Sequence, residues 1–172
     1  MTDIWIMRIG HRPQRDKRVT THVALSARAL GAKGIYVDTA DKILEENVKS
    51  VCERFGGDFE IRTGMKWKDR VKNFDGVVVH LTMYGQRLDE ALPKIPSDAD
   101  MLIIVGAEKV PPEVYERADY NVSVGNQPHS EIAALSIFLD RLTGGTALYG
   151  DRGGKLTVIP NERGKTVVEV PK

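Results

Sequence analysis

An unbroken apolar run in the second half of the chain constrains the fold most strongly. Residues 101–105 read Met-Leu-Ile-Ile-Val and stop at Gly106. A run without polar alternate positions indicates a strand buried on both faces, as in parallel sheets covered by helices. A second strand-like run, 121–124, also stops at a glycine, Gly125, and a helical pattern follows it. The two runs predict an open α/β fold whose ligand crevice lies beyond the carboxyl ends of its strands.

Strand-like and helix-like segments alternate along most of the chain. Short apolar runs predict strands at 4–9, 34–37, 59–62, 76–81, 101–106 and 121–124. Apolar residues at helical spacing predict helices at 19–30, 44–55, 66–73, 88–92 and 132–142, with a further helix start after Pro111. We therefore expect an α/β fold with a mostly parallel sheet and helices on both faces.

The pattern changes near the C-terminus. Two strand-like segments, 156–159 and 166–170, flank the turn-type sequence 161–164 and predict a β-hairpin. An isolated hairpin is only marginally stable in water, so we expect this one to pack on the domain or on a second subunit. We accordingly divide the chain into a main unit, 1–145, and a C-terminal hairpin extension of the same domain, 146–172.

Composition narrows the possible chemistry. The 172 residues carry a formal net charge of +1, which suits one domain and gives no global electrostatic argument for nucleic acid. Cys52 is the single cysteine, and the four histidines match no common zinc spacing, so no metal is expected. No apolar run approaches the roughly 20 residues that span a bilayer, and the first residues lack the basic start of a signal peptide. We expect a cytoplasmic protein that does not enter membranes.

The loop after the first expected strand, residues 10–18, is basic. Its cationic residues are Arg12, Arg15, Lys17 and Arg18, with His11 beside them and only Asp16 opposing them. One interpretation is a solvated surface turn. The other is a contact to RNA or DNA phosphates, which arginine binds in a bidentate manner. The position of the loop at the carboxyl end of a strand favours the second interpretation.

The two glycine-ended strands lead into further candidate residues. Glu108 and Lys109 form either an exposed ion pair at a turn or part of a ligand site. Ser130 is a credible N-cap of the last helix, with Glu131 favourably placed in the first turn, and a catalytic role for Ser130 can coexist with capping. Gly125 is expected to supply a positive φ or a close backbone approach. The glycine fingerprints of dinucleotide and P-loop sites are missing, which disfavours an enzyme that uses another nucleotide.

In the order and spacing of three motifs, the chain resembles the knotted SPOUT methyltransferases, and within them the archaeal tRNA (cytidine-56) ribose 2′-O-methyltransferase family. The motifs are the basic loop, the strand and turn 105–110, and the strand, loop and helix 121–134. Many ribose methyltransferases carry Asn-x-Gly-x-x-x-Arg in the first motif. Here Arg12, Arg15 and Arg18 are alternatives for the arginine of that motif. The C-terminal hairpin, where many relatives have a closing helix, fits the archaeal group.

The resemblance implies a fold and an activity. The fold would contain a C-terminal trefoil knot that forms a pocket for S-adenosylmethionine, the methyl donor. The activity would be transfer of the donor's methyl group to the ribose 2′-oxygen of cytidine 56 in the TψC loop of tRNA. Relatives work as dimers through the knotted region, so a homodimer is expected.

The resemblance also implies roles for residues. Arg18 is the implied catalytic residue, and Arg12, Arg15 and Lys17 are the implied RNA contacts. The implied cofactor contacts are Leu81, Gly106, Ala107, Glu108, Lys109, Val110, Val124, Gly125, Asn126, Gln127, Pro128, His129, Ser130 and Glu131. Because arginine has a pKa of about 12.5 to 13.8, we expect Arg18 to grip a phosphate and stabilise the developing alkoxide rather than to act as a general base.

Two alternatives stay open at this point. The first is a knotted methyltransferase that acts on another RNA nucleotide, because none of the motifs identifies a particular loop. The second is a non-catalytic RNA-binding protein of the same fold, which would bind no S-adenosylmethionine.

Overall fold

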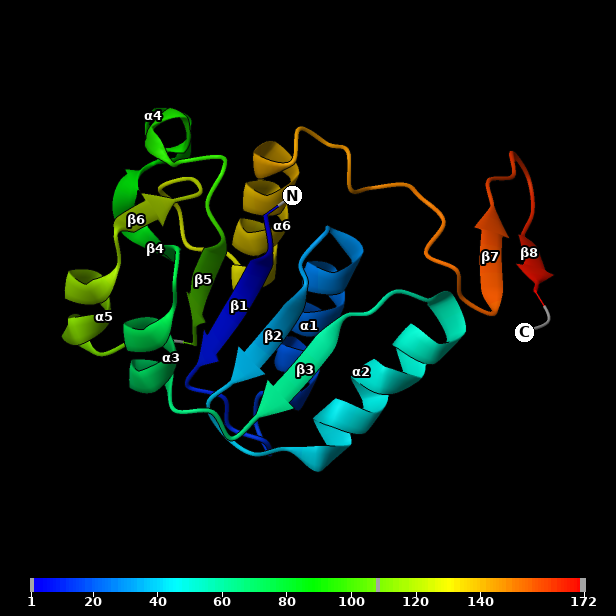
Figure 1. Cartoon of the computed structure of the whole chain (residues 1–172), viewed down its shortest axis with the longest axis horizontal. Helices are drawn as coiled ribbons and strands as arrows, with labels where there is room; N and C mark the ends of the chain where they lie inside the picture. The colour runs from blue at the N-terminus through cyan, green and yellow to red at the C-terminus, as the bar shows by residue number, and fades with distance from the viewer. Residues whose placement is uncertain (1, 108, 171–172) are drawn as a thin grey trace.

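Six parallel strands form the centre of the molecule, in the order β3-β2-β1-β5-β4-β6 (Figure 1). The computed structural model describes residues 2–107 and 109–170. The strands are β1 (Ile4–Ile9), β2 (Gly34–Val37), β3 (Glu60–Thr63), β4 (Val77–Arg87), β5 (Met101–Gly106) and β6 (Tyr120–Ser123). Every neighbouring pair runs parallel, which confirms the predicted parallel α/β architecture.

The position of β5 explains its unbroken apolar run. It lies between β1 and β4, and residues 101–105 are all buried. From β1 the chain moves outward through β2 and β3, whereas from β5 it crosses to β6 on the other side. The loops after β1 and β5 therefore diverge, and in open α/β sheets such a switch point is where ligands bind.

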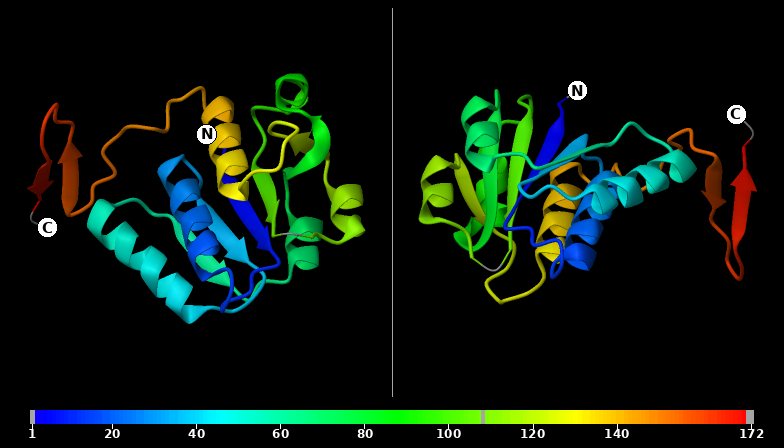
Figure 2. Two further views of the ribbon diagram at one scale, coloured as in Figure 1. Left: turned by 180° about the vertical axis from the view of Figure 1, so that it is seen from behind. Right: turned by 90° about the horizontal axis from the view of Figure 1, so that it is seen from below.

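The helices cover both faces of the sheet, as predicted (Figure 2). They are α1 (Lys17–Ala29), α2 (Lys42–Phe55), α3 (Trp67–Asn73), α4 (Leu88–Ala91), the 3₁₀ helix η1 (Leu92–Lys94), α5 (Pro112–Arg117) and α6 (Glu131–Leu142). Side chains alternate between the faces along each strand. Ile6 joins the core under α1, α2 and α6, while its neighbour Met7 joins the core under α3 and α5. Within the described residues, each helix is too short or too polar to span a bilayer.

Side-chain caps fix the start of two helices. Asp41 begins α2 by accepting a hydrogen bond from the backbone N–H of Leu44 at 3.0 Å. Ser130 begins α6 by accepting from the N–H of Ile132 at 3.1 Å, which confirms the predicted N-cap. Each cap satisfies one of the backbone donors that a helix start leaves unpaired. The cap at Ser130 fixes where Glu131 enters α6.

Strand β4 is longer than predicted. The sequence indicated a strand at 76–81, but pairing continues to Arg87 after a register shift between Leu81 and Gln86. Gly85 permits this pairing, because a Cβ at that position would lie 2.5 Å from backbone atoms of Asn121 and Val122. The extension has no continuous apolar pattern, so local sequence did not predict it.

The last two strands, β7 (Leu156–Ile159) and β8 (Thr166–Glu169), form a separate antiparallel sheet. In Figure 1 this pair projects beside α2, away from the main sheet. It is tied to the body upstream, where Gly153 bridges to Gly56 and the guanidinium of Arg152 donates to the carbonyls of Arg28 and Ala29.

Candidate active site

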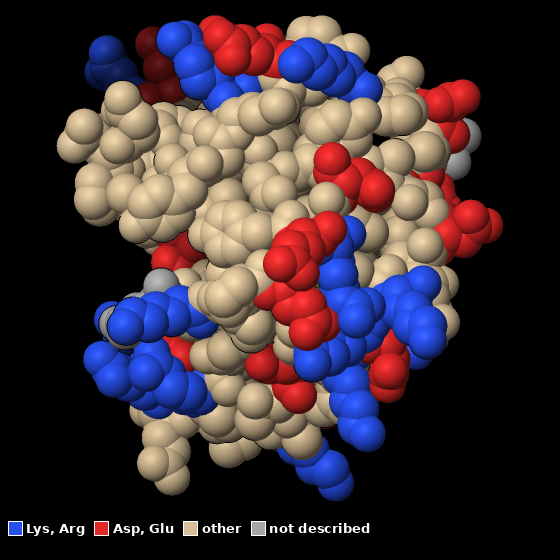
Figure 3. Space-filling model, turned by 90° about the vertical axis from the view of Figure 1, so that its left-hand side faces the viewer, with Lys and Arg blue, Asp and Glu red and all other residues tan. Residues whose placement is uncertain are grey.

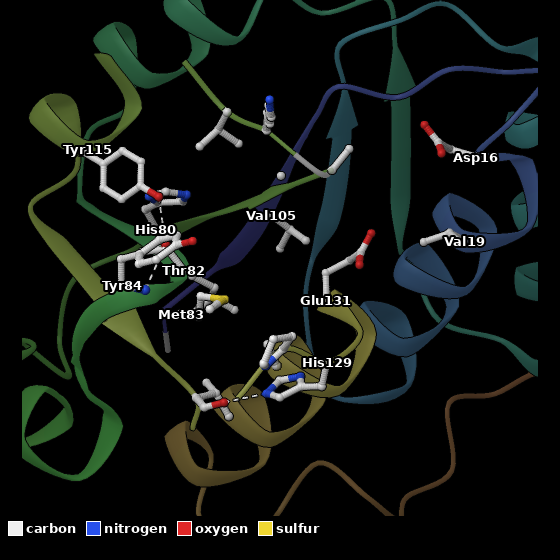
Figure 4. Close-up of a pocket in the computed structure, with 18 of the residues that line it drawn as sticks. Asp16, Val19, His80, Thr82, Met83, Tyr84, Val105, Tyr115, His129 and Glu131 are labelled. Atoms are coloured by element: carbon white, nitrogen blue, oxygen red, sulfur yellow. Dashed lines mark hydrogen bonds between the residues drawn. The ribbon is translucent and has the colours of Figure 1, made fainter. Parts of the chain in front are cut away.

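A cavity of about 810 Å³ lies at the switch point, beyond the carboxyl ends of β1, β5 and β6 (Figure 4). Its volume falls within the roughly 300–1,000 Å³ of typical small-molecule sites. The lining residues come from the basic loop and α1, from β4, from β5, the β5–α5 loop and α5, and from the β6–α6 loop and α6. They are Arg12, Arg15, Asp16, Val19, His80, Leu81, Thr82, Met83, Tyr84, Val105, Gly106, Ala107, Lys109, Val110, Tyr115, Val124, Gln127, Pro128, His129, Glu131 and Ala134.

The cavity brings together most of the residues predicted to hold a cofactor. Those that line it are Leu81, Gly106, Ala107, Lys109, Val110, Val124, Gln127, Pro128, His129 and Glu131. Gly125, Asn126 and Ser130 lie in the same β6–α6 loop but are not among its lining residues. Glu108 lies outside the described residues.

Some of the residues predicted to contact RNA also line the cavity, and others do not. Arg12 and Arg15 line the cavity, whereas Lys17 and Arg18 are exposed in the first turn of α1 and do not line it. Lysine and arginine side chains also gather in the lower half of the face shown in Figure 3, toward the end of the molecule to which β1 and β5 point. The basic loop therefore borders the cavity with some of its cations and presents others to solvent.

Buried contacts anchor the start of the basic loop. The ring of His11 is buried, with Nδ1 2.7 Å from the Thr20 hydroxyl and Nε2 2.9 Å from Oδ2 of Asp41. Asp38 accepts hydrogen bonds from the backbone N–H groups of Gly10 and His11. These contacts come from α1, α2 and the end of β2, so three elements determine where the loop leaves the sheet.

An internal ion pair shapes the middle of the loop. The Nε of Arg12 donates to Oδ2 of Asp16 at 2.9 Å, and the backbone N–H of Arg12 donates to the same oxygen at 3.0 Å. The hydrogen bond from Arg12 holds the pKa of Asp16 below its usual range. Asp16 is therefore an ionised structural partner in this loop.

Two glycines shape the loops around the cavity. At Gly106 a Cβ would lie 2.1 Å from Cγ1 of Val110, so any larger residue would displace a wall of the cavity. Gly125 has φ of +81°, which confirms the expected positive φ and turns the chain after β6.

Sequence reasoning missed one wall of the cavity, formed by His80, Thr82, Met83, Tyr84 and Tyr115. The hydroxyls of Thr82 and Tyr115 lie 2.9 Å apart, and the Tyr115 ring meets the His80 ring edge-on with centroids 4.8 Å apart. Thr82, Met83 and Tyr84 come from the extension of β4 and Tyr115 comes from α5, whereas His80 lies in the part of β4 that was predicted as a strand. The β4 extension has no apolar pattern, and Tyr115 reaches the cavity only through tertiary packing.

The two histidines of the cavity have opposite surroundings. His80 is buried, and burial lowers its pKa; its Nδ1 lies 2.9 Å from Oδ1 of Asn121. Both ring nitrogens of His129 face carbonyl oxygens, those of Val124 at 2.6 Å and Ser130 at 3.0 Å. Both contacts raise the pKa of His129, the one to Val124 most strongly, because only the protonated ring donates from both nitrogens. Figure 4 shows His129 beside Glu131 at the edge of the cavity.

Comparison with known proteins adds a family match and close relatives. Residues 55–168 match the family described as tRNA ribose 2′-O-methyltransferase, aTrm56. A protein of Archaeoglobus fulgidus named tRNA (cytidine(56)-2′-O)-methyltransferase is 55% identical over 166 residues, covering 96% of this chain and 98% of that protein. A Picrophilus torridus protein of the same name is 55% identical over 168 residues, and this chain spans 49% of its length.

Solved structures share the fold at low sequence identity. An RNA 2′-O ribose methyltransferase aligns with a TM-score of 0.60 at 17% identity, covering 84% of this chain and 56% of that one. The SpoU methyltransferase AviRb of Streptomyces viridochromogenes, solved with the cofactor AdoMet, aligns with a TM-score of 0.56 at 16% identity, covering 83% of this chain and 57% of that one. These likenesses support the α/β fold. This chain spans less than two thirds of either structure.

Proposed function

This chain belongs to the aTrm56 family of tRNA ribose 2′-O-methyltransferases, and from that membership we propose that it methylates the ribose 2′-oxygen of cytidine 56 in tRNA. The methyl donor is S-adenosylmethionine. The observation that carries the proposal is the 55% identity to the Archaeoglobus enzyme, which extends over 98% of that enzyme. A tRNA substrate agrees with the cytoplasmic location expected from the sequence. That location stays a prediction.

The cavity suits the proposed donor. S-adenosylmethionine supplies a methyl group bound to a positively charged sulfur. Leu81, Val105 and Val110 provide apolar walls for its flat adenine, while backbone N–H and C=O groups of the β5–α5 and β6–α6 loops read the adenine edge. We include Gly125, Asn126 and Ser130 in the proposed site because they belong to the same β6–α6 loop.

The protein's main task in this reaction is to hold the reacting oxygen in line with the methyl group. We propose that an arginine of the basic loop grips the phosphate beside the target ribose and stabilises the developing alkoxide, while phosphate or water takes the proton. Arg18 has this role by its motif position, whereas Arg15 lies in the cavity wall. Arg12, Arg15 and Lys17 supply further phosphate contacts.

Matched lysine variants separate the two arginines. If Arg18 grips the phosphate, Arg18→Lys should lose most of its turnover while keeping its affinity for S-adenosylmethionine, because lysine does not bind phosphate in a bidentate manner. If Arg15 has this role instead, Arg15→Lys should show that loss. Single-turnover methylation and calorimetry give the two readouts. Near-normal turnover of Arg18→Lys beside a large loss in Arg15→Lys would transfer the role to Arg15.

We infer a trefoil knot around the cofactor site. The support is topological: β6 is the edge strand beside β4, yet the following helix α6 packs against α1 near the middle of the sheet. Residues 124–130 therefore cross the ends of the intervening strands. Because knots are rare among folds, this inference depends on the family as well as on the strand order. Residues 146–172 form the proposed extension of this domain.

Labelled methyl transfer to an unmodified tRNA transcript tests the proposed function. The expected product is a single ribose, at cytidine 56, that resists alkaline cleavage. Label at another ribose would favour a different target nucleotide. Binding of the RNA without binding of S-adenosylmethionine would favour the non-catalytic alternative.

A further inference from the structure

A buried arginine connects three elements around the cavity. Arg8 lies in β1 and is 1% exposed. Its Nη1 donates to the carbonyl of Gly106 at 2.9 Å, its Nη2 to Oε1 of Glu131 at 3.1 Å, and its Nε to the Thr20 hydroxyl at 3.4 Å. The guanidinium thus joins the end of β5, the start of α6 and the side of α1. A charge this deeply buried is costly unless it is paired, so Glu131 is its necessary partner.

The pair is arranged with its negative member toward the cavity. Glu131 lines the cavity and its side chain is 32% exposed, whereas Arg8 does not line it. In Figure 4 the Glu131 carboxylate projects into the space between Val105 and Val19. Among the described lining residues the other carboxylate is Asp16, which is paired with Arg12 in the basic loop. Of these two carboxylates, only Glu131 has a cationic partner, Arg8, that lies behind the cavity wall rather than in it.

The proposed reaction changes the charge of the ligand. In methyl transfer the ribose oxygen bonds to the methyl carbon, the carbon–sulfur bond breaks with its electron pair on sulfur, and the hydroxyl proton passes to phosphate or water. The donor's sulfonium carries one positive charge, and the product S-adenosylhomocysteine has a neutral thioether there. The two molecules otherwise carry the same charged groups, so only a charge near sulfur distinguishes them electrostatically.

We infer that Glu131 is the residue that selects the cationic donor over its neutral product, and that Arg8 is the positioning residue that holds it. This inference rests on the proposed function. A fixed carboxylate in a partly water-excluded cavity attracts a sulfonium more strongly than it would in bulk water. The same carboxylate shields the sulfonium from the positive charge of Arg8. Glu131 therefore favours donor binding, and its attraction is lost once the methyl group has been transferred.

Calorimetry with two ligands tests this role. The readout is the ratio of the Kd for S-adenosylhomocysteine to the Kd for S-adenosylmethionine. Glu131→Gln should lower this ratio by on the order of tenfold, because it removes the carboxylate and leaves Arg8 uncompensated. Glu131→Asp, which keeps the charge, should retain most of the ratio. The double variant Arg8→Met with Glu131→Gln should recover part of it, since the uncompensated cation is gone.

Glu113→Gln is the matched control. Glu113 also lies in the first turn of a helix and pairs with an arginine, Arg117, at 2.8 Å, but it lies outside the cavity lining. Its substitution should leave the ratio unchanged. Equal weakening of both ligands in Glu131→Gln would show a purely structural role and overturn the inference. Failure of the unmodified protein to bind the donor would instead overturn the proposed function on which the inference rests.

Discussion

At the scale of single residues, His80 and His129 show how one cavity holds two opposite electrostatic environments. Burial disfavours the charged form of His80, while two carbonyl acceptors favour the charged form of His129. The contacts of His129 join both ends of the β6–α6 loop, to Val124 and Ser130. Protonation of His129 therefore stabilises this loop. That contribution is fully present below the unfolded-state pKa of about 6.5 and is lost as the pH rises through the higher pKa of the folded protein.

An NMR titration of the histidine rings tests this assignment. The resonance of His129 should titrate above the ordinary value of 6.5, and that of His80 below it. His129→Gln should remove the first resonance and weaken the pH dependence of amide exchange in the β6–α6 loop. The reverse order of the two titrations would contradict the environments described here.

The sequence predicted the cavity loops but not the contact that joins them. Gly106 and the helix start at Ser130 follow from local rules, because a glycine ends a buried strand and a serine caps a helix. Arg8 could not be interpreted in this way. Its partners Gly106 and Glu131 are 98 and 123 residues away along the chain. Only the sheet order, with β1 beside β5, brings them within hydrogen-bonding distance.

At the scale of elements, the C-terminal strand pair depends on its tether. Two strand-like segments flanking a turn-type sequence predicted this pair, but its attachment is made by backbone carbonyls and arginine side chains that carry no sequence pattern. Arg152 accepts from the N–H of Gly57 through its carbonyl and donates to the carbonyl of Ala29 through its guanidinium. Arg28 donates to the carbonyl of Gly56 at 2.5 Å. At Gly56 a Cβ would lie 2.4 Å from the carbonyl oxygen of Arg152, so the approach is as close as backbone allows.

Arg152→Ala should loosen this tether without unfolding the sheet. The expected result is faster proteolytic cleavage within 146–155 and a drop of about 1–3 kcal/mol in the free energy of unfolding, because hydrogen bonds from a charged guanidinium to backbone carbonyls are lost. Limited proteolysis and thermal unfolding measure the two effects. Arg163→Ala, in the turn between β7 and β8, is the control and should leave cleavage unchanged. Unchanged cleavage in Arg152→Ala would show that the tether is not needed.

At the scale of the whole molecule, the strand pair exposes an apolar surface. Val158 and Val167 pair across β7 and β8 and are 60% and 52% exposed. Ile159, Val168 and Val170 are exposed as well. A projecting two-stranded sheet with this surface is only marginally stable alone. We therefore propose that it contributes to the homodimer contact expected from the resemblance.

Charged substitutions at the strand pair test the dimer. Val158→Glu combined with Val167→Glu should shift the protein from dimer to monomer, because a dimer would bury both charges without partners. Analytical ultracentrifugation reads the mass directly. Lys165→Glu is the matched charge change in the exposed turn and should leave the mass unchanged. A monomeric unmodified protein at working concentration would contradict the proposal.

The most direct test of the central claim compares two tRNAs that differ at one oxygen. One carries cytidine at position 56 and the other carries 2′-deoxycytidine there, and both are incubated with the protein and labelled S-adenosylmethionine. The ribose 2′-hydroxyl is the proposed acceptor, so the first tRNA should become labelled and the second should not. Equal labelling of both would contradict methylation of the cytidine 56 ribose.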